Sequence, residues 1–448
     1  MLKLPCPPPL LGSESGSFTQ LTVTHRLPAI VRRVIGENSF PPDYNNKLER
    51  LAKDLVDGYV PPLEDDGGAD VADWRNYISP YIGQRWVDIP WFVTETYLYR
   101  KILEITGYFR PGEWQGADPF QAQKQASLEM SATAIIALCG ELNQWLQSPS
   151  RADFEETRNM LVALLYFALW GNRVDLSLWS AFEGNRSSFD IRRQQEHLLA
   201  DDTPQVVNLL TSSKNKRINL IADNAGFEFV CDLCLADFLL ESGLASQVNL
   251  HLKPHPTFVS DATLKDFQDT LGFLAGFEQP QVLALGKRLQ TWWEDQRLVC
   301  VEDWFWTSPL AGWEMPAPVR EELARAGLTV FKGDANYRRL LGDRHWDFTI
   351  PLADIVCYLP APAVALRTLK SEVAAGLDPS QVEALNRTGT DWLTNGQWGV
   401  IQLAHGGGTG GIGMNSPNCP WLCPSALVNF FDFRKNAYIQ NRAKAGYL

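Results

Sequence analysis

The spacing of hydrophobic residues divides the chain into two halves with different expected secondary structure. From about Leu27 to Glu196, apolar residues recur three and four positions apart, which is the period of an amphipathic helix. The clearest stretches are 29–35, 48–56, 91–105, 127–146 and 159–170. Strand patterns are scarce here, so we predict an α-helical N-terminal unit over residues 18–205. It follows a Pro-, Ser- and Gly-rich segment, 1–17, that we expect to be disordered.

After about Val207, short β-rich runs alternate with helical stretches. The predicted strands are 218–222, 247–252, 328–331, 355–358, 363–366 and 399–403, and the helices lie near 226–241, 262–276, 280–294, 316–326 and 379–386. Such alternation is typical of βαβ units with right-handed crossovers. We therefore predict an α/β fold, in which a doubly wound, mostly parallel sheet over 206–404 is preceded by the helical unit. Residues 405–448 are expected to form a Gly/Pro-rich loop and a C-terminal segment.

Composition and charge narrow the classes of partner. The chain has 448 residues, 45% of them hydrophobic, and a net charge of -12 from 40 basic and 52 acidic residues. No Lys/Arg run stands out, which argues against nucleic acid or a membrane surface as a partner. The chain has neither a signal-peptide core nor an apolar run of about 18 residues, so we expect a cytoplasmic protein. We expect a monomer or weak oligomer.

The eight cysteines are scattered, which argues against a disulfide scaffold. Cys231 and Cys234 have the spacing of a redox or metal pair, but no second Cys or His pair at zinc spacing accompanies them. We interpret them as buried residues of a helix.

Polar side chains follow four of the predicted strands. They are Asp223 and Asn224 after 218–222, Ser260 and Asp261 after 247–252, Asp334 and Asn336 in a turn at Gly333 after 328–331, and Arg367, Thr368 and Lys370 after 363–366. Ligands of open α/β sheets bind at the carboxyl ends of strands, so we expect these side chains to share one site. Carboxylates with an amide favour a hard cation such as Mg²⁺ or Mn²⁺, and Arg with Lys favours a phosphate. The sequence therefore predicts a metal-dependent phosphoryl site.

Each of these residues also has a simpler interpretation. Asp223 and Asn224 suit the cap of the helix that follows, and so does Asp261. Arg338 and Arg339 suit either surface or salt-bridged positions, and Lys332 suits a solvated one. Position is what favours the joint site, because all four groups stand at strand ends.

Six segments resemble one known family, the metal-dependent damage-control phosphatases, in the subfamily with an Arg-Thr-x-Lys motif that was also described as acidic-residue carboxyl methyltransferases. The segments are Trp-Phe-Val-Thr-Glu-Thr-Tyr-Leu-Tyr-Arg at 91–100, Trp-Gly-Asn-Arg-Val-Asp-Leu-Ser at 170–177, Asp-Asn-Ala-Gly-Phe-Glu at 223–228, Phe-Val-Ser-Asp at 258–261, Lys-Gly-Asp-Ala-Asn-Tyr-Arg at 332–338 and Arg-Thr-Leu-Lys at 367–370. They occur in the family's order between about residues 25 and 404. In the 170–177 segment, Asn172 and Asp175 are candidates to border the site, whereas packing explains Trp170.

The resemblance implies helices packed on an α/β domain that binds Mn²⁺, Mg²⁺, Co²⁺ or Ni²⁺. It implies Asp223, Asn224 and Asp261 as metal ligands, and Arg367, Thr368 and Lys370 as contacts of the substrate phosphate, with Asp334 and Asn336 close by. Family substrates include fructose 1-phosphate, fructose 6-phosphate and related sugar phosphates. One departure concerns Gln397, also a candidate substrate contact, which stands where a Lys is expected.

We therefore expect a phosphatase that hydrolyses phosphomonoesters of small sugars by metal-activated water, with Asp223, Asn224 and Asp334 as catalytic residues. An alternative mechanism is phosphoryl transfer to Asp223, with an aspartyl-phosphate intermediate. One rival is methyl transfer from S-adenosylmethionine to protein carboxylates, although no Gly-x-Gly-x-x-Gly motif supports a nucleoside pocket. The other is a sugar-phosphate or metal-binding module with weakened catalysis, which the loss of a Lys at Gln397 would favour.

Overall fold

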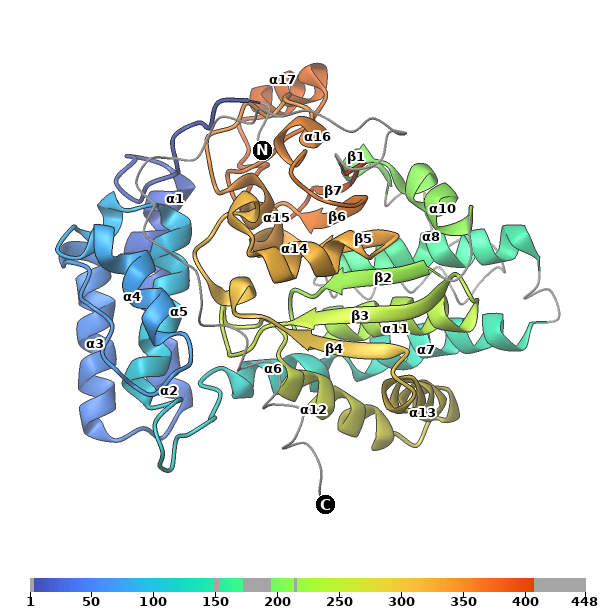
Figure 1. Ribbon diagram of the computed structural model, residues 1–448, viewed down its shortest axis with the longest axis horizontal. Helices are drawn as coiled ribbons and strands as arrows, with labels where there is room; N and C mark the ends of the chain where they lie inside the picture. The colour runs from blue at the N-terminus through green and yellow to red at the C-terminus, as the bar shows by residue number, and fades with distance from the viewer. Residues whose placement is uncertain (1–3, 149–152, 172–194, 213–215, 407–448) are drawn as a thin grey trace. The chain divides into compact units, whose positions relative to one another are not determined.

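Seven strands form one sheet in the part of the chain that the computed structural model describes, residues 4–148, 153–171, 195–212 and 216–406 (Figure 1). The strands are β1 Leu198–Asp201, β2 Lys216–Ile221, β3 Ala245–Leu252, β4 Leu298–Glu302, β5 Leu328–Lys332, β6 Ala363–Thr368 and β7 Gly399–Ala404. Their order across the sheet is β1-β7-β6-β5-β2-β3-β4. Neighbouring strands are parallel except β6 and β7, which are antiparallel. The predicted mostly parallel α/β sheet is confirmed.

The predicted strands that are observed are the buried apolar runs, which correspond to β2, β3, β5, β6 and β7. The strand predicted at 355–358 is wrong, because Ile355 ends the short helix α16 (Leu352–Ile355). The apolar pattern does not predict β1 and β4, which are the two edges of the sheet. Their apolar stretches are short, three residues in β1 and four in β4, and several side chains of each strand are only half-buried.

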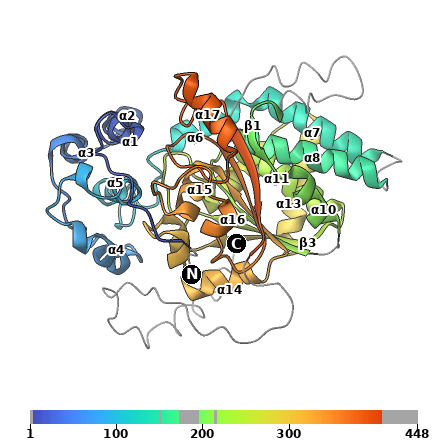
Figure 2. The same cartoon turned by 90° about the horizontal axis from the view of Figure 1, so that it is seen from above.

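The helices form three groups along the chain (Figure 2). The N-terminal group is α1 Phe18–Leu21, the π-helix η1 Thr22–Arg26, α2 Leu27–Glu37, α3 Pro42–Asp57, α4 Val71–Ile78, the short η2 Ser79–Tyr81 and η3 Trp86–Asp88, and α5 Trp91–Thr106. The second group is α6 Gln121–Met130, α7 Ala132–Gln147, α8 Phe154–Trp170, α10 Thr203–Thr211, α11 Phe227–Glu241, α12 Leu264–Ala275 and α13 Pro280–Glu294. The third is η6 Trp304–Thr307, η7 Gly312–Glu314, α14 Ala317–Ala324, α15 Gly333–Leu341, α16, and α17 Pro379–Arg387.

Two hydrophobic cores lie on the two faces of the sheet, because alternate strand residues point to opposite sides. Leu220 and Val330 join the core of the second helix group, whereas Ile221 and Phe331 join the core of the other face. Helix α11 is buried along almost its whole length, which explains why it is apolar on every side. Its free cysteines Cys231 and Cys234 are buried, as predicted.

The N-terminal helices α2 to α5 share one core with helices α14 to α17 on the second face of the sheet. Helices α7 and α8, which the prediction assigned to the N-terminal unit, instead pack on α11. Strand β1 also falls inside the predicted range 18–205. The predicted boundary at residues 205 and 206 therefore does not coincide with the division between the two cores, because apolar helical periodicity does not tell which core a helix joins.

The prediction of disorder over residues 1–17 is wrong for residues 4–17, the part that is described. Leu10 is buried, its N–H donates to the Asp343 carbonyl at 3.2 Å, and its carbonyl accepts from Trp91 N–H at 2.9 Å. The segment therefore gains backbone partners from both helix α5 and the loop after helix α15, which its Pro-rich composition does not reveal. Of the predicted C-terminal loop and segment, 407–448 lie outside the described residues, as do Asn172 and Asp175.

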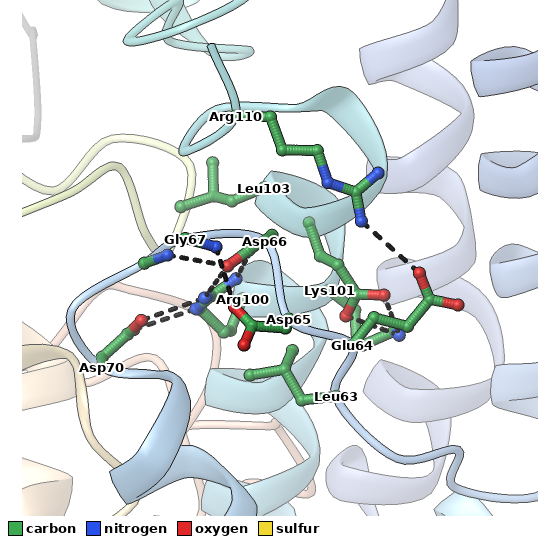
Figure 3. Close-up of polar contacts among 12 residues, drawn as sticks. Leu63, Glu64, Asp65, Asp66, Gly67, Asp70, Arg100, Lys101, Leu103 and Arg110 are labelled. Atoms are coloured by element: carbon green, nitrogen blue, oxygen red, sulfur yellow. Dashed lines mark hydrogen bonds and ion pairs between the residues drawn. The ribbon is translucent and has the colours of Figure 1, made fainter.

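A buried ionic cluster fixes the loop before α4 to helix α5 (Figure 3). The Arg100 guanidinium donates to both oxygens of Asp66, at 2.7 and 2.9 Å, and to both oxygens of Asp70, at 2.9 Å. Figure 3 also shows the more exposed pair of Arg110 and Glu64, which are 3.4 Å apart. Arg100, the last residue of the first family segment, therefore has a structural role here.

Candidate active site

The site lies at the topological switch point of the sheet, between β2 and β5. From β2 the chain proceeds to β3 and β4 on one side, and β5 and β6 lie on the other. Such a switch point opens a crevice at the carboxyl ends of the strands. A cavity of about 300 Å³ is found there, lined by Arg26, Trp91, Glu95, Leu169, Asp223, Asn224, Glu228, Phe258, Ser260, Asp261, Gly333, Asp334, Ala335, Arg338, Leu366, Thr368 and Lys370.

Backbone pairing brings Asp261 next to Asp223 and Asn224. The segment after β2 and the loop after β3 form an isolated antiparallel bridge between Asn224 and Asp261. Ala262 N–H donates to the Asp223 carbonyl at 2.8 Å, and Ala225 N–H donates to the Ser260 carbonyl at 2.7 Å. The predicted metal ligands thus come from two strand ends and line one cavity.

The same loop explains why Asp261 is not a helix cap. Helix α12 is capped by Thr263, whose side chain accepts from Asp266 N–H in a capping box. Helix α11 begins after Gly226, and no side chain caps it. The capping alternatives for Asp223, Asn224 and Asp261 are therefore wrong. Phe258 and Val259 have positive φ values of 48° and 69°, a strained turn that precedes Ser260.

Hydrogen bonds fix the orientation of the Asn224 amide. Its Nδ2 donates to Asp223 Oδ2 at 2.8 Å and to Glu228 Oε2 at 2.9 Å, and its Oδ1 accepts from the Ser260 hydroxyl. Glu228 is held in turn by Lys332, 3.0 Å away. Sequence reasoning gives Glu228 no role of its own. The sequence feature that could have indicated a role for Glu228 is its position, four residues after Asn224 in the first turn of α11.

Lys332 and Arg338 are not solvated surface residues. Lys332 is buried and also lies 3.0 Å from Asp232. Arg338 is buried, donates to Glu95 at 2.5 Å and to Asp343 at 2.7 Å, and lies 3.6 Å from the Trp91 ring centroid. The pair of Arg338 and Glu95 joins helix α5 to helix α15 at the edge of the cavity. Arg339 is buried as well and donates to two backbone carbonyls.

The carboxylates of the cavity are buried and only partly neutralised. Burial raises the pKa of Asp223 well above its ordinary value, and the neighbouring Glu228 and Asp261 carboxylates raise it further. Burial also raises the pKa of Asp261 to about 6, although Lys253 opposes this effect. Asp261 Oδ2 is buried without a hydrogen bond, with the Lys253 ammonium 3.3 Å away. These oxygen atoms and the Asn224 amide suit a hard divalent cation.

The donor set differs from an all-carboxylate or histidine site. Among the described residues, no group of three or more His, Cys, Asp or Glu side chains is arranged to hold a metal ion. The candidate site here has two carboxylates, Asp223 and Asp261, with the Asn224 amide as the third donor.

Asp334 is held by the arginine of the Arg-Thr-x-Lys motif. Its Oδ1 accepts from Arg367 Nε at 2.8 Å and from the Ser371 hydroxyl at 3.0 Å. Burial raises the pKa of Asp334, but the nearby Arg367 and Arg338 charges outweigh it, so the pKa lies below its ordinary value. The predicted turn at Gly333 is wrong, since helix α15 begins there and places Asp334 in its first turn.

Three predicted substrate contacts do not line the cavity. Arg367 is buried, with its guanidinium occupied by Asp334, Ser371 and the Val373 carbonyl. Asn336 is buried and donates to the carbonyls of Ala222, at 3.1 Å, and Lys332, at 2.8 Å. Gln397 is exposed, away from the cavity. The structure thus gives Arg367 and Asn336 supporting positions behind the cavity wall.

Thr368 and Lys370 do line the cavity. Thr368 donates to the Leu169 carbonyl at 3.3 Å. No described residue forms a hydrogen bond or an ion pair with the half-buried Lys370 ammonium. Of the other lining residues, Trp91, Glu95 and Phe258 belong to segments of the family resemblance, whereas Arg26 belongs to none and has no motif that would reveal it.

A family model described as the damage-control phosphatase ARMT1-like domain matches residues 22–385. The chain is 34% identical over 442 residues to the damage-control phosphatase ARMT1 of Xenopus tropicalis, covering 89% of this chain and 99% of that protein. It is 32% identical over 437 residues to the human protein of the same name, covering 88% and 98%. The chain belongs to the ARMT1-like damage-control phosphatase family.

Membership in the ARMT1-like family supports a phosphatase, and the cavity residues from Arg26 to Lys370 all fall inside the matched range. Gln397 lies beyond it. A crystal structure of a DUF89 family protein from Pyrococcus horikoshii is also similar, with a TM-score of 0.44 and 14% identity over 85% of this chain and 96% of that one. No helix among the described residues is both long and apolar enough to cross a bilayer.

Proposed function

We propose that this ARMT1-like protein is a divalent-metal-dependent phosphatase that hydrolyses phosphomonoesters of small sugars, of the fructose 1-phosphate or fructose 6-phosphate type. The observation that carries the proposal is that one cavity holds the Asp223, Asn224 and Asp261 donors together with the Lys370 ammonium. A cation site beside a free ammonium suits a phosphate, whose oxygen atoms require positive charge from two directions.

Asp223, Asn224 and Asp261 would hold the metal ion. When bound, a divalent cation lowers the pKa of water and neutralises charge on the phosphoryl oxygens. The protein contributes the fixed orientation of the donors. Glu228 and Ser260 hold the two ends of the Asn224 amide, and the strained turn at Phe258 and Val259 lies directly before Ser260 and Asp261.

Asp334 is proposed to orient the attacking water. Its Oδ1 is engaged by Arg367 and Ser371, whereas Oδ2 accepts no hydrogen bond from any described residue. A carboxyl with a lowered pKa is ionised at neutral pH, so Oδ2 can accept a hydrogen bond from water. The low pKa also makes it a weak base, which favours orientation of the water over removal of a proton.

Lys370 is proposed to bind the phosphate of the substrate. Its ammonium lines the cavity with no partner in the described part of the chain. A compact cation there stabilises the negative charge of the phosphoryl oxygens in the transition state. The rival module without turnover was favoured by Gln397, but this residue is exposed and outside the cavity, so the geometry gives that rival no support.

The test is phosphate release from a panel of sugar phosphates, with the chelated protein and after addition of Mn²⁺, Co²⁺ or Mg²⁺. The proposal predicts metal-dependent release that is strongest for fructose phosphates. Parallel incubation with a labelled methyl donor addresses the rival transferase. Labelling of protein carboxylates without phosphate release, or release that survives chelation unchanged, would contradict the proposal.

A further inference from the structure

Arg26 presents an unpaired guanidinium to the cavity. It is the last residue of η1, its side chain is exposed, and it lines the cavity. Within the described ranges it has no ion pair or hydrogen bond, whereas the other lining arginine, Arg338, is buried against Glu95 and Asp343. Arg26 is therefore the lining arginine that is available to a ligand, and the proposed mechanism does not use it.

The position of Arg26 depends on a local break in helix geometry. The N–H of Leu27 donates to the carbonyl of Thr22, five residues earlier, so the turn that contains Arg26 is a π-helix. Pro28 follows at the start of α2; it has no N–H, and its ring crowds the carbonyl four residues before it. The wider turn relieves this crowding and changes the direction in which the side chains of that turn point. Single π turns inside helices frequently occur at functional sites.

The segment that carries Arg26 is tied to the loop that carries Lys370. Two residues after Lys370, the Glu372 carboxylate accepts from Phe18 N–H at 3.0 Å, from Thr19 N–H at 3.1 Å and from the Thr19 hydroxyl at 3.1 Å. A carboxylate at this position satisfies the free N–H groups of the first turn of α1. The two cations are therefore held in a fixed relationship although they are far apart in the sequence.

The residues that line the cavity come from two groups of elements. The proposed metal donors and Lys370, which would contact the phosphate, follow strands of the sheet. Arg26 comes from η1 and Glu95 comes from α5, both in the N-terminal helices. Arg26 supplies N–H donors, and Glu95 supplies carboxylate oxygens that accept. A polyhydroxylated molecule needs both kinds of partner, because each hydroxyl group donates and accepts.

We propose that Arg26 is a substrate-binding residue that contacts the hydroxyl or carbonyl oxygens of the sugar, the part that is not transferred, while Lys370 takes the phosphate. This inference rests on the proposed function and deepens it. It assigns the specificity for sugar phosphates over other phosphomonoesters to the cavity residues that the N-terminal helices supply. Arginine suits this role because its planar fork can reach two neighbouring oxygen atoms.

The experiment compares fructose 1-phosphate with p-nitrophenyl phosphate, which has no hydroxyl groups on its leaving group. The variants are Arg26→Ala and Arg26→Lys, and the control is Arg33→Ala, an exposed arginine of α2 that pairs with Glu37. We expect Arg26→Ala to raise KM for fructose 1-phosphate roughly 10- to 100-fold, the size of one or two lost charged hydrogen bonds, with kcat within about twofold. Arg26→Lys should recover part of this loss, and the constants for p-nitrophenyl phosphate should not change.

An unchanged KM for fructose 1-phosphate in Arg26→Ala would overturn the inference. So would an equal loss for both substrates, which would assign Arg26 to the phosphate. If the wild-type protein releases no phosphate from any sugar phosphate, the proposed function fails, and calorimetry of fructose 1-phosphate binding then decides the inference separately. Weaker binding by Arg26→Ala than by Arg33→Ala supports it, and equal binding or no binding by the wild type overturns it.

Discussion

Gly333 and Asp223 lie so close together that a side chain on Gly333 would overlap the Asp223 carboxylate. The cause is the register of the sheet, in which Ile221 of β2 pairs with Phe331 of β5. Asp223 and Gly333 each follow two residues after these partners and therefore meet. Gly333 also has a φ of 77°, a conformation that glycine adopts without strain. The glycine thus makes room for the carboxylate at the switch point.

Gly333→Ala should abolish most activity, because the new methyl group must displace the Asp223 carboxylate or separate the two strand ends. We expect kcat to fall at least about 100-fold, the order seen when a positioned catalytic group is displaced. Gly389→Ala is the matched control, since Gly389 has a φ of 65° but nothing within 4 Å of an added methyl group. Both variants should lose about 1 kcal/mol of unfolding free energy from the backbone strain. Equal activity of the two variants would show that the contact with Asp223 does not matter.

Lys370→Ala and Arg367→Ala should separate the two cations of the Arg-Thr-x-Lys motif. Removing the Lys370 ammonium should lower kcat/KM by roughly 10- to 100-fold and leave the melting temperature nearly unchanged, because no described residue depends on it. Removing Arg367 leaves the Asp334 carboxylate without its main partner, so stability should fall by about 3–5 kcal/mol together with activity. Steady-state kinetics and thermal melts check both. A stable Arg367→Ala with intact secondary structure would contradict the supporting role of Arg367.

Arg100→Ala should destabilise the fold far more than Arg110→Ala. Arg100 is fully buried between two carboxylates, and its loss leaves Asp66 and Asp70 charged and buried, at a cost of about 3–5 kcal/mol. Arg110 is paired with Glu64, but the side chains of both are exposed, at 41% and 74%, so its removal should cost under about 1 kcal/mol. Urea unfolding of the two variants measures the difference. Similar losses would mean that the cluster is not what holds the loop to α5.

His251 and His255 should each lower stability as the pH decreases from about 6.5 to 4, whereas the raised pKa values of the buried Asp223 and Asp261 act in the opposite direction. Burial lowers the pKa of His251 to about 3 and that of His255 to about 4. In the unfolded chain each takes up a proton near pH ~6.5, so the unfolded state binds more protons across this range and stability rises with pH. The stabilisation of the neutral rings is complete above pH ~6.5 and is lost as the pH falls towards the folded-state values.

His255→Gln should reduce this pH dependence by up to about 1.4 kcal/mol per pH unit, the contribution of one histidine. Urea midpoints between about pH 4.5 and 7.5 test this, with the exposed His25→Gln as control, and carboxylates that titrate in the same range affect both variants alike. An unchanged slope in His255→Gln would exclude the buried ring as a source of the pH dependence.

The central strands could be predicted because they are buried on both faces. β2 and β5 stand out as short apolar runs, whereas the prediction omits the edge strand β4, most of whose side chains are only half-buried. Helix α15 escapes prediction because Gly-Asp-Ala-Asn is typical of a turn, and the helix begins directly after β5 at Gly333, which has a positive φ of 77°. Local pattern therefore gives the parallel sheet but not the elements that tertiary contacts decide.

The candidate site was predictable where chemistry coincides with a strand end. Asp223, Asn224, Asp261 and Lys370 line the cavity for this reason. The sequence does not reveal that the Arg367 side chain is buried outside the cavity, because the guanidinium binds the Val373 carbonyl, a contact that depends on the tertiary fold. Other lining residues come from helices that are distant in the chain, and no spacing rule connects them to the strand ends.

Calorimetric titration with Mn²⁺ of the wild-type protein and of Asp223→Ala, each followed by a phosphate-release assay with fructose 1-phosphate, tests the central claim most directly. The account predicts saturable Mn²⁺ binding and turnover in the wild type, with both lost in Asp223→Ala. Substantial phosphate release by Asp223→Ala in the presence of Mn²⁺ would contradict it.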